Sequence, residues 1–186
     1  MVAGAVLAGG QSRRMGRPKA FIEIDGVPMV VRAAEAIGEA GVTDVVVVGG
    51  DATALRGLGL VAVADRHPGE GPLGGIITAL HHHRASADAV VVVSCDLIQA
   101  SPLAVRSLIA SLGSGDAAVP VVEGRSQWTH AIWRTRALEP LEAAFSQGMR
   151  APRAAVAGLD VVLVLDGAPC WYADADRPED LPPGAC

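Results

Sequence analysis

Residues 6–19 read Val6-Leu-Ala-Gly-Gly-Gln-Ser-Arg-Arg-Met-Gly-Arg-Pro-Lys19, and this stretch says most about the fold. An apolar run over 2–7 stops at Gly9-Gly10, and a polar loop follows. Paired glycines let backbone N–H groups come close to an anion and converge on it. Four cations that could add charge to the same anion follow: Arg13, Arg14, Arg17 and Lys19. The pattern predicts a buried strand that carries a phosphate-binding loop to the rim of a sheet.

The familiar glycine signatures for phosphate are missing from the sequence. It contains no Gly-Lys-Ser/Thr, which a Walker loop requires. Gly9, Gly10 and Gly16 do not have the G-x-G-x-x-G spacing of a dinucleotide-binding turn. The loop is therefore expected to bind phosphate in another way, and a plain strand-to-helix connection with surface cations is the alternative.

Composition favours one aliphatic domain over residues 1–186, with a disordered tail at 182–186. Apolar residues make up 51% of the chain but aromatic residues only 3%, so the core must be built from aliphatic side chains. Val45–Val48 and Val90–Val93 are apolar on both faces, which is typical of strands covered by helices on each side.

Charge and cysteine usage exclude several classes of protein. No apolar run reaches the roughly 18 residues of a membrane span. A net charge of −5, without a basic aromatic face, argues against a nucleic-acid binder. The cysteines, Cys95, Cys170 and Cys186, show no metal-ligand spacing, and a cytoplasmic location is expected.

Strand-like and helix-like segments alternate, which predicts a Rossmann-like three-layer α/β/α sandwich with a mostly parallel sheet. The expected strands lie near 2–7, 21–24, 44–48, 60–64, 89–94, 117–122, 129–133, 159–165 and 170–174. The expected helices lie near 28–40, 73–84, 102–112, 136–147 and 151–157.

Ligands of open α/β sheets bind beyond the carboxyl ends of the strands, and four segments should meet there. They are the Gly9-Gly10 loop, Asp65 with the glycine-rich loop after it, Asp96, and Asp174 with Asp176. Asp96 could be a simple turn former, or it could hold Mg²⁺, which favours one or two carboxylates plus substrate phosphates. Asp174 is the better candidate for a second ligand, because Asp176 or Arg177 could merely begin the last turn.

Three other features have simpler interpretations. The run His81–His83 is expected to form a solvated helix face, because consecutive helical residues do not face one another. His130 could contact an acceptor or simply pack. Cys95 is expected to be a buried apolar side chain rather than a nucleophile.

With these residues assembled, the chain resembles nucleotidyltransferases of the molybdenum-cofactor guanylyltransferase type, which have the fold of nucleotide-diphospho-sugar transferases. The resemblance covers residues 6–181 and rests on four motifs in the family's order. They are Leu7-Ala-Gly-Gly-Gln-Ser-Arg-Arg-Met-Gly16 followed by Lys19, Gly71-Pro-Leu-Gly-Gly75, Ser94-Cys-Asp96 and Asp174-Ala-Asp-Arg-Pro-Glu-Asp-Leu181.

The resemblance implies transfer of GMP from GTP to the terminal phosphate of molybdopterin, with release of pyrophosphate and with Mg²⁺ as cofactor. Lys19, Arg14 and Asp96 would be catalytic, and Asp96 and Asp174 would bind the metal. The nucleotide would contact Leu7, Ala8, Gly9, Gly10, Lys19, Asp65, Gly71, Pro72, Leu73 and Asp96. Transient contact with proteins that deliver the cofactor, or with molybdoenzymes, would fit this activity.

Departures from the family keep other activities open. The family often has Asn where this chain has Asp174 and Asp176, and aspartates there resemble cytidylyl- and sugar-nucleotide enzymes. The paired glycines and the Gly71–Gly75 loop favour guanine. The alternatives are a CTP-dependent molybdopterin cytidylyltransferase, a sugar-phosphate nucleotidyltransferase, and a nucleotide-binding regulator without catalysis.

Overall fold

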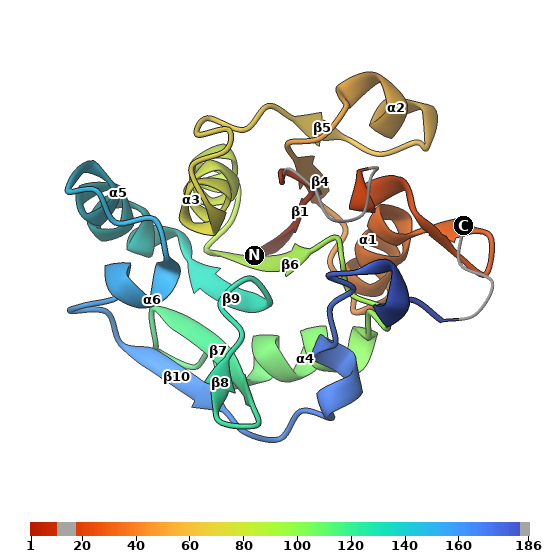
Figure 1. Ribbon diagram of the computed structural model, residues 1–186. Helices are drawn as coiled ribbons and strands as arrows, with labels where there is room; N and C mark the ends of the chain where they lie inside the picture. Colours follow the sequence, from red (N-terminus) through yellow and green to blue (C-terminus); the bar gives the residue numbers. More distant parts are fainter. Residues whose placement is uncertain (11–17, 183–186) are drawn as a thin grey trace.

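The computed structural model describes residues 1–10 and 18–182, and its core is a mixed sheet between two layers of helices (Figure 1). The strand order is β10-β7-β9-β6-β1-β4-β5, with β8 paired to β7. The strands are β1 (Val2–Leu7), β4 (Val45–Val48), β5 (Ala62–Val63), β6 (Ala89–Ser94), β7 (Ala117–Val122), β8 (Arg125–Ser126), β9 (Ala131–Arg134) and β10 (Val161–Val164). A separate hairpin joins β2 (Glu23–Ile24) and β3 (Val27–Pro28).

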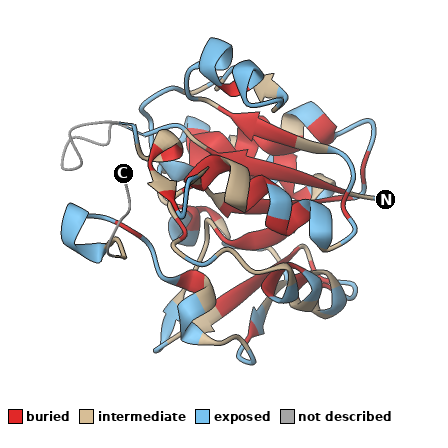
Figure 2. Cartoon of the chain, turned by 90° about the vertical axis from the view of Figure 1, so that its right-hand side faces the viewer, coloured by how far each residue is buried: buried red, intermediate tan, exposed pale blue. Residues whose placement is uncertain are grey.

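Helices cover both faces of the sheet, and the buried residues lie between the layers (Figure 2). The α-helices are α1 (Met29–Glu39), α2 (Ala52–Gly57), α3 (Pro72–His83), α4 (Pro102–Ser111), α5 (Leu138–Ser146) and α6 (Pro152–Ala155). The 3₁₀ helices are η1 (Lys19–Phe21), η2 (Thr135–Ala137), η3 (Pro169–Tyr172) and η4 (Pro178–Asp180). One apolar cluster contains residues of α3, α5 and α6, and the other contains residues of α1, α2 and α4.

The central strands are apolar on both faces because each face meets a helical layer. Within β1, Ala5 and Leu7 join the cluster with α3, whereas Val6 between them joins the cluster with α1. β1 pairs in parallel with β4 and β6, and β9 runs antiparallel between β6 and β7. The predicted α/β/α sandwich with a mostly parallel sheet is confirmed.

One predicted strand does not form, and the structure contains one helix that the sequence pattern did not predict. Residues 170–174 do not form a strand: Pro169 begins 3₁₀ helix η3, and Tyr172 turns into the interior. The segment joins the β6 loop only through a bridge between Leu97 and Asp174. The unpredicted helix is α2, whose N-cap Asp51 accepts hydrogen bonds from two backbone N–H groups of the first turn.

The expectation of a solvated histidine face on α3 is also wrong in part. His82 is exposed, but His83 is only 1% exposed, because the end of α3 turns this ring toward the sheet. Its Nδ1 lies 3.3 Å from Oδ2 of Asp44. Within residues 1–10 and 18–182, no helix has the length and apolar character that crossing a membrane requires.

Candidate functional site

The loops after β1, β5 and β6 meet at the carboxyl ends of neighbouring strands, as the strand order requires. They enclose a cavity of about 500 Å³ whose lining is rich in glycine. We call this cavity the glycine half of the site. Its lining residues include Leu7, Gly9, Gly10, Asp65, Gly71, Pro72 and Ser94.

Glycine is required where the loop after β4 touches the loop after β1. Gly49 follows β4 with a φ of +78°, and a Cβ there would lie 3.0 Å from both N and Cα of Gly9. On another wall, Gly71 caps the N-terminus of α3 with a φ of +90°. The positive dipole end of α3 suits an anionic ligand here, although the N–H groups of Leu73 and Gly74 are bonded to the carbonyls of Arg150 and Gly71.

Asp65 is held in one orientation at the wall of the glycine half. Its Oδ1 accepts hydrogen bonds from the hydroxyl of Thr78 at 2.9 Å and the backbone N–H of His67 at 3.0 Å. Its Oδ2 faces Gly9, since a Cβ built on that glycine would lie 3.4 Å from this oxygen. Thr78 is buried on α3, so the helix fixes the direction of the carboxylate.

Charged side chains gather beside the glycine half, around a smaller cavity of about 160 Å³ that shares Gly9, Gly10 and Ser94 with it. Lys19 donates to Oδ2 of Asp96 at 3.0 Å and to Oδ1 of Asp176 at 2.8 Å. We call Lys19, Asp96, Asp174 and Asp176 the carboxylate half of the site.

The lysine stays charged among these carboxylates. Burial disfavours the ammonium form, but the hydrogen bond to Asp176 and the charge of Asp96 outweigh it and raise the pKa of Lys19. Cys95, beside Asp96, is different: burial raises the pKa of its thiol to about 12. Cys95 is therefore the buried apolar side chain that was predicted, and it is no nucleophile at neutral pH.

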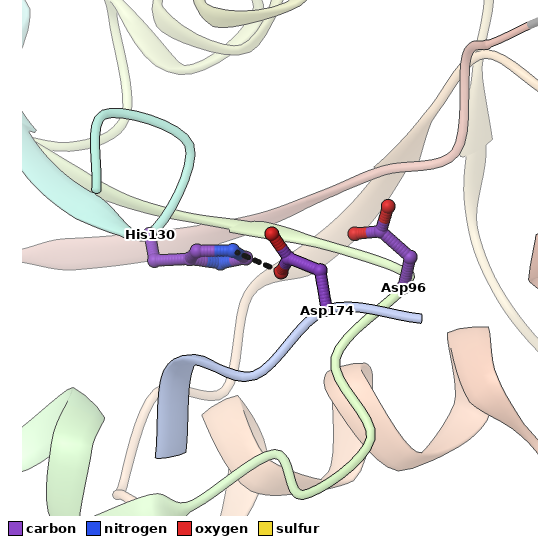
Figure 3. Close-up of side chains that lie close together, drawn as sticks. All are labelled: Asp96, His130 and Asp174. Atoms are coloured by element: carbon purple, nitrogen blue, oxygen red, sulfur yellow. Dashed lines mark hydrogen bonds and ion pairs between the residues drawn. The ribbon is translucent and has the colours of Figure 1, made fainter. Parts of the chain in front are cut away.

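Two members of the carboxylate half, Asp96 and Asp174, lie close to His130 (Figure 3). Nε2 of His130 lies 3.2 Å from Oδ1 of Asp174. One ligand atom from each of these three residues falls within 4.8 Å of the others, so together they could surround a cation. The hydroxyl of Ser94 donates to Oδ1 of Asp96 and holds that carboxylate in place.

Most of the predicted site residues lie around this cleft. Ala8, Lys19 and Asp96 line the smaller cavity. Leu73 packs in the core, and its backbone N–H bonds to the carbonyl of Arg150. Arg14, with 11–17, lies outside the described residues.

Sequence reasoning missed the residues that support others in the site. Thr78 carries no motif, and neither the motif around Ser94 nor the two interpretations of His130 predicted these contacts, because they join segments far apart in sequence. Asp176 was considered mainly as a turn former, yet its carboxylate bonds to Lys19, and Arg177 is the N-cap of η4. One residue separates Asp174 from Asp176, so in an extended segment both side chains lie on the same side, and this spacing is the signal that points to Asp176.

The chain is similar to known sequences over almost its whole length. A family model described as MobA-like NTP transferase domain matches residues 4–161. A molybdenum cofactor guanylyltransferase from Rhodobacter capsulatus is 34% identical over 185 residues, which cover 97% of this chain and 93% of the relative. One from Cereibacter sphaeroides is 35% identical over 148 residues, which cover 78% of this chain and 75% of the relative.

Solved structures share the fold at lower identity. Molybdopterin-guanine dinucleotide biosynthesis protein A from Archaeoglobus fulgidus aligns with a TM-score of 0.78 at 24% identity, over 97% of this chain and 94% of the other. CMP:2-keto-3-deoxy-manno-octonic acid synthetase in complex with CTP aligns with a TM-score of 0.75 at 18% identity, over 96% and 94%. These two similarities concern the fold alone.

Proposed function

The chain belongs to the family of MobA-like NTP transferases, and on this premise we propose that it transfers GMP from GTP to molybdopterin and releases pyrophosphate. The observation that carries the proposal is the 34% identity to a molybdenum cofactor guanylyltransferase over nearly the full length of both chains. The cleft has what nucleotidyl transfer asks of a protein, which is mainly positioning and neutralisation of charge.

The glycine half would hold the nucleotide. Leu7 to Gly10 would present backbone groups to the base and phosphates, and the start of α3 at Gly71 and Pro72 would face the same cavity. Asp65 offers an oriented acceptor, which suits the hydroxyls of a ribose or the N–H groups of a base.

The carboxylate half would hold the metal and the charge of the triphosphate. Asp96 and Asp174 fit Mg²⁺, because carboxylate oxygens are its preferred protein ligands and substrate phosphates can supply others. When bound, Mg²⁺ would neutralise charge that develops on the phosphoryl oxygens. Lys19 would direct its ammonium toward the same phosphates, and Arg14 remains a predicted partner outside the described residues.

Lys19 would also change partners during binding. Without a ligand, its ammonium lies between Asp96 and Asp176 and offsets the repulsion between their charges. With Asp96 holding a divalent ion, Lys19 would direct its ammonium toward the triphosphate. No covalent nucleophile is needed, because the acceptor phosphate attacks the α-phosphorus directly and pyrophosphate leaves.

The test is pyrophosphate release from each of four nucleoside triphosphates, with Mg²⁺ and molybdopterin. We expect release with GTP and little with ATP, CTP or UTP. Omitting molybdopterin should abolish release, which excludes simple hydrolysis of GTP. Robust release with CTP but none with GTP would overturn the proposal.

The cytidylyltransferase is the second candidate, because aspartates occupy the positions of Asp174 and Asp176 where guanylyltransferases often have asparagine. The same panel separates the two, and a hexose phosphate in place of molybdopterin tests the sugar-nucleotide alternative. A cytoplasmic location and contact with cofactor-delivery proteins stay predictions.

A further inference from the structure

His130 lies beside Asp96 and Asp174, the proposed metal ligands, and each of its two ring nitrogens contacts another residue. His130 is only 2% exposed and directly precedes β9, and its ring lies 6.3 Å from that of Tyr172, centroid to centroid. The backbone N–H of Ser94 lies 3.3 Å from its Nδ1, and Oδ1 of Asp174 lies 3.2 Å from its Nε2.

The contact with Ser94 indicates which ring nitrogen carries the proton. The hydrogen of Ser94 is a backbone hydrogen, so Nδ1 must act as the acceptor and carries no proton. A neutral imidazole then has its proton on Nε2, which donates to Asp174. While Nδ1 accepts from Ser94, a cation on Nε2 would leave both ring nitrogens without a proton, so this arrangement disfavours His130 as a metal ligand.

We infer that His130 is a positioning residue, which holds Asp174 so that its carboxylate faces Asp96 across the cation site. This role rests on the proposed use of a metal by the enzyme, but not on the identity of the nucleotide. Figure 3 shows Asp174 between the ring and Asp96. No described residue donates a hydrogen bond to Oδ2 of Asp174, so this oxygen can serve as a ligand.

Ser94 supports both proposed ligands, one through its side chain and the other through its backbone. Its hydroxyl holds Asp96, and its N–H orients the ring that holds Asp174. The backbone adds a direct connection, since the N–H of Ala175 bonds to the carbonyl of Asp96 at 2.9 Å. The 173–176 segment lacks support from a regular strand, so a side-chain hydrogen bond to Asp174 matters for the direction of the carboxylate.

The test is Mn²⁺ affinity, measured by EPR on the full chain without nucleotide or acceptor. His130→Phe keeps a ring but removes both nitrogens, and it should weaken Mn²⁺ binding roughly 10–100-fold, the usual effect of losing such a partner. His130→Gln keeps an N–H donor near the place of Nε2 and should restore most of the affinity. His82→Phe, the same change on an exposed ring of α3, should bind like the wild type.

Pulsed EPR of the Mn²⁺-bound wild type supplies a second readout that does not depend on any variant folding. A positioning role predicts no ¹⁴N coupling from a coordinated imidazole. Such a coupling, wild-type affinity in His130→Phe, or equal losses in the Phe and Gln variants would each overturn the inference. A wild type that binds Mn²⁺ but releases no pyrophosphate would instead contradict the proposed function and leave the role of His130 standing.

Discussion

Five glycines help to line the glycine half, whereas the carboxylate half is built of charged side chains that come from segments far apart in sequence. Gly9, Gly49 and Gly71 shape the first half through close contacts and positive φ angles. Lys19, Asp96 and Asp174 shape the second through hydrogen bonds and charge. The glycine half should therefore be sensitive to added size, and the carboxylate half to lost charge.

The largest effect is expected from removing one charge without changing shape. Asp96→Asn should lower the rate of pyrophosphate release by about 10²–10³-fold, because it removes electrostatic stabilisation that acts on the transition state. The measurement is kcat at saturating GTP and Mg²⁺. Asp166→Asn, at an exposed position, is the control and should leave the rate unchanged. A near-normal rate for Asp96→Asn would remove this residue from the catalytic group.

Adding a single methyl group at Gly49 should weaken nucleotide binding by the glycine half. Gly49→Ala places a Cβ 3.0 Å from the backbone of Gly9 at a strained φ, which costs on the order of 1–3 kcal/mol. GTP affinity by calorimetry should fall about tenfold or more, while Mn²⁺ affinity stays near the wild-type value. Gly57→Ala, where a Cβ meets no atom within 4 Å, is the matched control. Equal losses of GTP and Mn²⁺ affinity would contradict the division into two halves.

A smaller effect is expected at Thr78, whose buried hydroxyl orients Asp65 in the wall of the glycine half. Thr78→Val keeps the side-chain shape but removes the hydrogen bond to Asp65, which is worth about 0.5–1.5 kcal/mol. The KM for GTP should rise several-fold with little change in kcat. Thr135→Val, which removes a hydroxyl bonded to carbonyls far from the cleft, should leave KM unchanged. An unchanged KM for Thr78→Val would mean that Asp65 needs no such support.

The same contrast explains how much the sequence could predict. The run 2–7 and the paired glycines are contiguous, so they identify both the central strand and the loop that it carries. Asp96 could be predicted at the rim, because strand ends in a parallel sheet meet there, whereas Asp174 lies there although the strand predicted before it is a 3₁₀ helix. Their supports could not be predicted, since the bond from Ser94 to His130 joins residues that are 36 positions apart.

The two wrong element predictions have the same physical origin. Cys170-Trp-Tyr172 has strand-like composition, but Pro169 starts a 3₁₀ helix, and Tyr172 is buried among tertiary contacts. The histidine run looked like a solvated face, yet α3 lies against the sheet, and His83 is buried near Asp44. In both places, tertiary packing rather than the local sequence pattern determines the structure.

The smallest effect concerns stability away from the site. Burial lowers the pKa of His83 below its ordinary value of 6.5, although Asp44 acts in the opposite direction. The unfolded chain therefore takes up a proton at a higher pH than the folded one, and the free energy of unfolding should decline as pH falls below about 6.5. Denaturant unfolding at pH 7.5 and 5.5 should show a weaker decline for His83→Leu. An equal decline in both proteins would contradict this assignment.

The most direct test of the two-part cleft is the GTP affinity of the wild type and of Asp96→Asn, each measured with and without Mg²⁺. If the glycine half holds the nucleotide and the carboxylate half holds the metal, the two proteins should bind GTP comparably without Mg²⁺. Adding Mg²⁺ should then tighten binding only in the wild type. An Asp96→Asn protein that gains as much affinity from Mg²⁺ as the wild type, or that fails to bind GTP without it, would contradict this account.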